Sequence, residues 1–273
     1  MARKGSKPAG AMPFACSARE PQTSGPWACA LTDTRMRFVG STDLGKVRSG
    51  NEDCYGFDAR RRVAVLADGM GGLNAGEVAS AAAVRAFLDE VPDPCDRDSL
   101  ASAAKHANRT VYELSHTHPD TSLMGTTLVA CVAVGDDSAE EARWLFANIG
   151  DSRAYLLRDG DLIQVTRDHS VVQELTEQGL LTEAEARTAP NRHIITRAVG
   201  LEAEVEADIA ELPRASGDLV LLCSDGLTDM LAEPVLHELL QQDDPLEQAA
   251  DALVAAANQA GGVDNISVVL IEA

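Results

Sequence analysis

Short apolar runs separated by turn residues dominate the chain from Met36 onward. Each run is long enough for one β-strand, and several are joined by tight turns, which is typical of antiparallel sheets. The segment RAYLLRDGDLIQVT, for example, predicts a hairpin that turns at Asp159 and Gly160. The predicted strands cover residues 37–43, 54–59, 62–68, 126–134, 143–149, 153–158, 161–166, 218–224 and 265–272.

Three longer segments have apolar residues at the three- and four-residue spacing of a helix: 74–91, 98–116 and 243–262. In the last of these we expect Asp244 to be the N-cap, Pro245 the first helical residue and Gly261 the terminator. A less apolar helical segment near 167–200 is interpreted as a flap. The pattern predicts an α+β fold with two antiparallel β-sheets sandwiched between α-helices and a small flap insertion.

Composition narrows the functional classes. The chain of 273 residues is 45% hydrophobic, so it can bury a large core, and its net charge is -20. Nucleic acids and anionic membranes both need a basic surface, so we expect neither as a partner. No apolar stretch approaches the length that spans a bilayer.

Cysteine usage and the N-terminal segment bear on compartment and domain organisation. The six cysteines are irregularly spaced and form no zinc motif, and Cys131 and Cys223 lie in apolar runs where a buried thiol is expected. We therefore expect a reduced, cytoplasmic protein. Residues 1–34 are rich in Pro, Gly, Ser and Ala without a secretory apolar core, which predicts a disordered leader before a domain at 35–273.

The segment VAVLADGMGGLNAG (63–76) has a strand followed by a glycine-rich turn and a helix. This order of elements is typical of dinucleotide-binding domains, but their G-x-G-x-x-G motif needs a third glycine where this chain has Asn74. Asp68 would also repel a pyrophosphate at the end of the strand. No P-loop motif occurs anywhere in the chain.

Acidic residues recur at the ends of apolar runs, and this favours a metal site over a phosphate cradle. Asp and Gly are ordinary turn residues, so each occurrence alone is weak. A carboxylate at the end of a buried strand is nonetheless costly unless it is paired. Several carboxylates without His or Cys select hard cations such as Mg²⁺ or Mn²⁺. The residues in question are Asp68, Asp151, Asp225 and Asp264.

A series of motifs, in this order, resembles the type 2C metal-dependent serine/threonine protein phosphatases, and most closely their bacterial members. The similarity covers about residues 37–272. It implies hydrolysis of phosphoserine and phosphothreonine by direct attack of a metal-bridging hydroxide. The motifs are GSTDLGKVRSGNEDCYGF (40–57), ADGMGG (67–72), GTT (125–127), ANIGDSRAYLL (147–157), QVTRDHS (164–170), ITRAVG (195–200), CSDGLTDML (223–231) and GGVDNISVVL (261–270).

The resemblance also implies a role for individual residues. Asp68 would bridge two Mn²⁺ or Mg²⁺ ions, and Gly69 would contribute its backbone carbonyl. Asp225 and Asp264 would bind the first ion, and Glu52 would hold the second through water. Asp151 would bind a possible third ion. The supporting residues would be Asp53 and Asn265, and Arg48 would bind the substrate phosphate, for which a guanidinium fork is suited.

The sequence departs from the family pattern at the position of a histidine near the metals. Many bacterial members carry it shortly after DGMGG, where this chain has Leu73, and eukaryotic members place it directly after DG, where this chain has Met70. The identity of the general acid is therefore open. His169 is expected to be structural, and His193 is expected to be an exposed flap residue.

The resemblance implies phosphorylated proteins as partners, together with a Ser/Thr kinase that the enzyme would oppose. We expect a monomer whose flap sets substrate preference. A competing hypothesis is a catalytically weak domain that binds metal or phosphoprotein and signals by interaction. The missing histidine favours that alternative, and the retained acids with Arg48 disfavour it.

Overall fold

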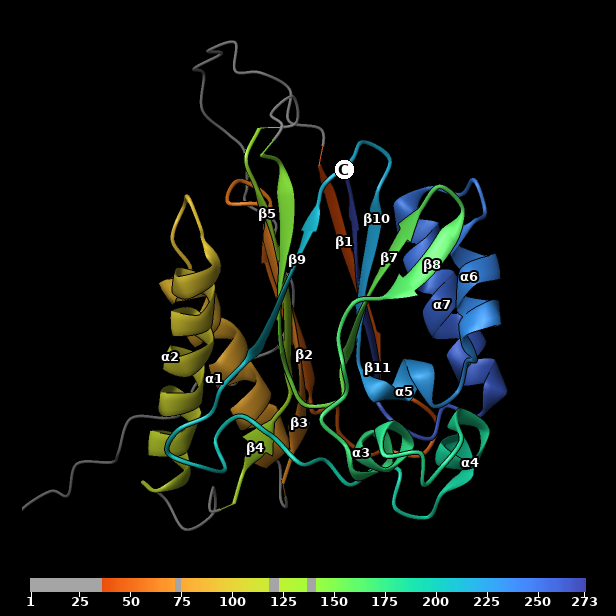
Figure 1. The fold of residues 1–273 in the computed structure, drawn as a ribbon. Helices are drawn as coiled ribbons and strands as arrows, with labels where there is room; N and C mark the ends of the chain where they lie inside the picture. Colours follow the sequence, from red (N-terminus) through yellow and green to blue (C-terminus); the bar gives the residue numbers. More distant parts are fainter. Residues whose placement is uncertain (1–35, 72–74, 118–122, 137–140) are drawn as a thin grey trace, which may run out of the picture.

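The computed structural model describes residues 36–71, 75–117, 123–136 and 141–273. The predicted leader at 1–34 lies outside these residues, as do Leu73 and Asn74. Two antiparallel sheets stack face to face with helices on both outer surfaces (Figure 1). The predicted α+β sandwich is therefore confirmed.

The first sheet has the strand order β1-β11-β10-β7-β8. Every pairing in it is antiparallel, and β11 lies between β1 and β10. The helices cover one face of β10 and β11 and the second sheet covers the other, which explains the continuous apolar runs of these strands. The strands are β1 (Arg37–Asp43), β7 (Arg153–Arg158), β8 (Asp161–Gln164), β10 (Leu219–Cys223) and β11 (Ile266–Glu272).

The second sheet has the order β2-β3-β5-β6-β9, and the short β4 pairs with the end of β3. Strand β9 was not predicted from the sequence. It is an edge strand with half-exposed residues, so it lacks a continuous apolar run. The strands are β2 (Asp53–Asp58), β3 (Val63–Met70), β4 (Gly125–Thr126), β5 (Leu128–Val134), β6 (Arg143–Ile149) and β9 (Asp208–Pro213).

Helices α1 (Ala75–Glu90) and α2 (Arg97–Ser115) cover the second sheet, whereas α6 (Glu233–Leu240) and α7 (Leu246–Ala260) cover the first (Figure 1). Alanines on α1 and α2 bring these helices close to the sheet and to each other. A third apolar cluster, which includes the fully buried Trp144 and Phe146, fills the space between the sheets. Cys131 and Cys223 are fully buried, as predicted.

The start of α7 corrects one prediction. Pro245, not Asp244, is the N-cap, because its carbonyl accepts the first helical hydrogen bonds from the backbone N–H groups of Gln248 and Ala249. Gly261 ends the helix with φ of 152°, as its position predicted.

Short helices gather at one end of the sandwich. The flap segment contains α3 (Val171–Glu177) and α4 (Glu183–Thr188), and the one-turn helix α5 (Asp225–Thr228) follows β10 beside them (Figure 1). Helices α5 and α6 were not predicted; the start of α5, where an apolar run meets Asp225, was interpreted as a turn. Among the described residues, no helix is long and apolar enough to cross a membrane.

Candidate active site

The predicted site residues meet in one pocket of about 640 Å³ at the flap end of the sandwich. Asp68 comes from the end of β3, Asp225 follows β10, and Asp264 precedes β11. Strand ends from both sheets therefore converge as the sequence suggested. The pocket wall includes Arg48, Glu52, Asp68, Gly69, Asp151, Asp225 and Asp264.

Asp68 is fixed through its backbone. Its N–H donates to the Thr127 hydroxyl over 2.9 Å, and its carbonyl accepts from the Thr127 N–H at 2.9 Å and the Thr126 hydroxyl at 2.8 Å. Thr127 in turn shares a 2.7 Å hydrogen bond with Ser152, next to Asp151. The GTT and GDSR motifs thus hold two of the site's acids in a fixed relation.

Gly69 packs so tightly that no side chain fits at its position. A Cβ there would lie 2.1 Å from the Gly76 carbonyl oxygen and 2.6 Å from that of Glu52. The Gly69 N–H also donates to the Glu52 carbonyl over 3.1 Å. Glycine at this position therefore brings the β3 backbone against the Glu52 loop and α1.

Asp53 and Asn265 support the site from behind. Asp53 is buried, pairs with Asp68 across β2 and β3, and accepts a 2.8 Å hydrogen bond from the Ser224 hydroxyl. The Asn265 amide oxygen accepts from the Glu52 N–H at 2.8 Å, while its amide group donates to the carbonyls of Leu44 and Gly50. Asn265 thus ties the start of β11 to the loop that carries Arg48 and Glu52.

Except for Asp264, which lies against Arg48, the acids of the pocket form no ion pair with a basic residue among the described residues. Burial, strengthened by the other acids, raises the pKa of Asp68 and Asp151 well above the usual range. The same causes raise the pKa of Asp53 to about 7 and that of Asp225 to about 6. One carboxylate oxygen of Asp53 and one of Asp225 are buried without a hydrogen-bond partner among the described residues.

Arg48 lies on the pocket wall, half-exposed, and its Nη2 is 2.6 Å from Asp264 Oδ2. The structure therefore places the predicted phosphate-binding arginine against a predicted metal ligand. A guanidinium has five N–H donors, and the contact with Asp264 uses only one of its nitrogens, Nη2.

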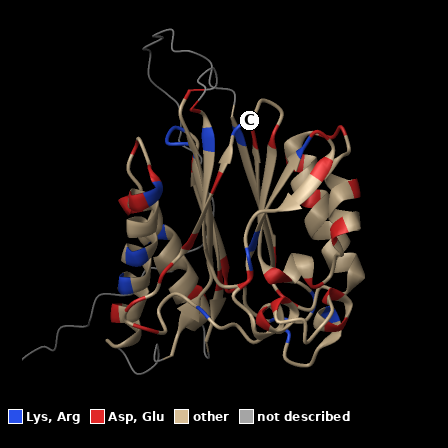
Figure 2. Cartoon of the chain, in the orientation of Figure 1, with Lys and Arg blue, Asp and Glu red and all other residues tan. Residues whose placement is uncertain are grey.

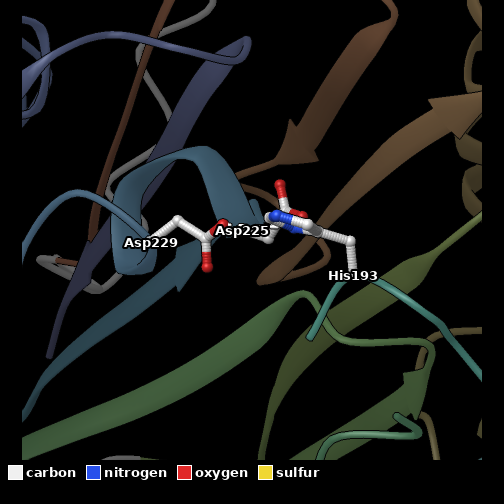
Figure 3. Close-up of side chains that lie close together, drawn as sticks. All are labelled: His193, Asp225 and Asp229. Atoms are coloured by element: carbon white, nitrogen blue, oxygen red, sulfur yellow. Dashed lines mark ion pairs between the residues drawn. The ribbon is translucent and has the colours of Figure 1, made fainter. Parts of the chain in front are cut away.

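Two functional candidates were missed or undervalued from the sequence. His193 lines the pocket, and its Nδ1 is 3.3 Å from Asp229 Oδ2 (Figure 3). His193, Asp225 and Asp229 each have one potential metal-ligand atom, and these three atoms lie within 4.8 Å of one another. The sequence signal for this cluster was the i, i+4 spacing of Asp225 and Asp229 in SDGLTD. That spacing brings two side chains together only on a helix, and α5 was not predicted.

His169 has the structural role that was expected. It is 1% exposed, and its Nδ1 accepts a 3.0 Å hydrogen bond from the Gly150 N–H, while its Nε2 lies 3.2 Å from Asp208 Oδ2. The residue holds the Gly150–Asp151 turn against the base of the flap.

The chain matches the protein phosphatase 2C family model over residues 48–267. It is 38% identical over 241 residues to the serine/threonine phosphatase stp of Listeria monocytogenes, covering 85% of this chain and 93% of that protein. The crystal structure of the Mycobacterium tuberculosis serine/threonine phosphatase PstP is 37% identical with a TM-score of 0.80, covering 87% of this chain and 98% of that one. A structure of the PstP catalytic domain in complex with two manganese ions is 37% identical with a TM-score of 0.77, covering 87% and 97%. This chain belongs to the protein phosphatase 2C family.

Proposed function

We propose that this chain hydrolyses phosphoserine and phosphothreonine in proteins in a reaction that depends on divalent metal ions. The observation that carries the proposal is the group of carboxylates around Asp68, whose pKa burial and the neighbouring acids raise, with Arg48 on the same pocket wall. Such a group is unfavourable unless it binds cations. Family membership and the named activities of the relatives support the same function.

The residues present fit Mn²⁺ or Mg²⁺. Carboxylate and carbonyl oxygens are the ligands that these cations prefer. One oxygen of Asp53 and one of Asp225 are buried and accept no hydrogen bond from the described residues. Asp68, Asp225, Asp264 and the Gly69 carbonyl would hold two ions, with Glu52 contributing through water; Asp151 would contribute to a third. When bound, two such ions lower the pKa of a water that they share and neutralise phosphoryl oxygens.

The chain's own residues would orient the substrate and keep the ligands in place. Arg48 would bind two phosphate oxygens with its guanidinium fork while it remains beside Asp264. Thr127 and Asn265 would maintain the ligand geometry, because each fixes the backbone next to a carboxylate. No covalent enzyme intermediate is needed for this chemistry.

The biological context that we propose is a cytoplasmic monomer that opposes a Ser/Thr kinase. Its substrates would be phosphorylated proteins, and neither nucleic acid nor membrane would be a partner. The excess of acidic over basic residues, 43 against 23, supports that exclusion. Acidic residues are spread over both helical layers and the strand ends (Figure 2).

The test is hydrolysis of a phosphothreonine peptide by the purified chain with Mn²⁺, with Mg²⁺ and with EDTA. We expect turnover with either metal and none with EDTA. Asp68→Ala, shown by circular dichroism to be folded, should be inactive. A folded wild-type protein without turnover in either metal would favour the interaction-domain alternative.

A further inference from the structure

The reaction needs a proton donor for the oxygen that leaves. A serine or threonine alkoxide is a poor leaving group, so its departure is faster when a positioned acid protonates it. The donor must line the same pocket as Arg48 and the cation-binding carboxylates. It must also be a group that is not itself a cation ligand.

Among the described residues, His193 is the one histidine on the pocket wall. The other acids there, which include Asp68, Asp225 and Asp264, are assigned to cations. Arginines do not release protons at neutral pH. No lysine, tyrosine or cysteine of the described residues lines this pocket. His193 is therefore the remaining side chain with suitable proton chemistry.

The backbone around His193 is fixed although the residue belongs to the flap. The Ile194 carbonyl accepts a 2.9 Å hydrogen bond from the Val171 N–H, and the Thr196 N–H donates to the His169 carbonyl over 2.8 Å. An isolated β-bridge joins Ile195 to Ser170. These contacts anchor the His193 segment to the base of the flap.

Asp229 orients the imidazole. Its carboxylate lies 3.3 Å from His193 Nδ1 (Figure 3), and its own backbone N–H donates to the Asp225 carbonyl over 2.8 Å, one helical turn away. A carboxylate on Nδ1 directs the other ring nitrogen, Nε2, away from Asp229. The His193 side chain is 50% exposed and lines the same pocket as Arg48, so the ring is open to a ligand in that pocket.

We propose that His193 is the catalytic residue that protonates the leaving oxygen, with Asp229 as its positioning residue. This inference rests on the proposed function. A water-derived hydroxide forms the new P–O bond, and the bond from phosphorus to the serine or threonine oxygen breaks with its electron pair on that oxygen. The oxygen takes the proton from Nε2 of the imidazolium. Neutral His193 then regains a proton from water.

The experiment compares two substrates that differ in their need for an acid. The leaving group of p-nitrophenyl phosphate is a stable anion that departs without protonation, whereas a phosphothreonine peptide leaves as an alkoxide. His193→Gln should lower kcat for the peptide about 10²-fold. Its kcat for p-nitrophenyl phosphate should stay within about twofold of wild type. Asp229→Asn should show the same selective loss to a smaller extent.

His106→Ala is the matched control, because His106 is exposed on α2 and does not line the pocket. It should leave both activities unchanged. Mn²⁺ affinity measured by calorimetry should be the same for wild type and His193→Gln. Equal losses on both substrates, or a weakened Mn²⁺ affinity, would overturn the proposal and make His193 a structural residue or a metal ligand. Wild-type protein that hydrolyses neither substrate would instead contradict the proposed function itself.

Discussion

Two aspartates flank strand β10: Asp218 comes directly before its first residue, Asp225 comes two residues after its last, and their surroundings are opposite. Asp218 is fully buried and accepts hydrogen bonds from Arg158 at 2.6 Å, Trp144 at 2.7 Å and the Ala215 N–H at 2.9 Å. Burial alone would raise the pKa of Asp218, but Arg158 and the other donors hold it below the usual range. The protein therefore supplies the hydrogen-bond donors and the positive charge that the Asp218 carboxylate needs.

Asp225, at the other end of β10, faces further acids. Burial and the charges of Asp229 and Asp264 raise its pKa to about 6, and one of its oxygens is buried without a partner among the described residues. The comparison teaches that burial does not distinguish a structural acid from a ligand. What distinguishes them is whether the fold supplies the donors, and at Asp225 it does not.

The most direct test of this difference is to replace the two aspartates that flank β10 by asparagine, one at a time. Asp225→Asn should lower kcat for a phosphothreonine peptide about 10³-fold or more, because a divalent cation contributes several kcal/mol to transition-state stabilisation. Its metal-free stability in urea should not fall, since the substitution removes a repelled charge.

Asp218→Asn is the matched control. It leaves Arg158 without its buried partner, so the free energy of unfolding should fall by about 3 kcal/mol. The folded variant should keep its kcat. If Asp218→Asn were as inactive as Asp225→Asn while folded, or if Asp225→Asn were the less stable protein, the two ends would not differ as the structure indicates.

The raised carboxyl pKa values also predict a pH dependence for the metal-free protein. The folded state binds these protons more tightly than the unfolded chain, whose aspartates titrate near the ordinary value of about 3.9. Stability from Asp53 and Asp225 is therefore present below about pH 4 and is lost as pH rises through about 6 to 7.

Asp68→Asn isolates this effect from other titrating groups. In EDTA, thermal unfolding should show the variant to be more stable than wild type at about pH 7.5, by about 4 °C or more, and the advantage should vanish near pH 4. Saturating Mn²⁺ at about pH 7.5 should reverse the order, because only wild type keeps the ligand. An advantage independent of pH would mean that Asp68 is not repelled by its neighbours.

Much of the fold was predictable because most strands are apolar runs bounded by turn residues. The sandwich, α1, α2 and α7 followed from periodicity alone. The half-exposed edge strand β9 and the one-turn helix α5 did not, since neither has a distinctive pattern. At the start of α7 the sequence predicted Asp244 as the N-cap, and only the geometry showed that Pro245 is the N-cap.

The site was predictable where a motif links acids to strand ends. Asp68, Asp225 and Asp264 meet because the ends of β3 and β10 and the start of β11 lie at one pocket. The pairing of His193 with Asp229 was not predictable, because it joins the flap to α5 across the pocket. A lone histidine in an irregular segment has no partner pattern, and its direction depends on hydrogen bonds to α3 and His169.

The smallest expected effect concerns Arg48, whose guanidinium lies against Asp264 on the pocket wall. Arg48→Ala should raise KM for a phosphothreonine peptide about tenfold and change kcat little, since a lost charge-assisted hydrogen bond costs about 1.5 kcal/mol and acts on bound phosphate in ground and transition states alike. Arg48→Lys should recover only part of this, because an ammonium cannot bind two phosphate oxygens as a planar fork does. Steady-state kinetics at saturating Mn²⁺ separate the two parameters. An unchanged KM would leave Arg48 as a partner of Asp264 alone and remove phosphate binding from its proposed roles.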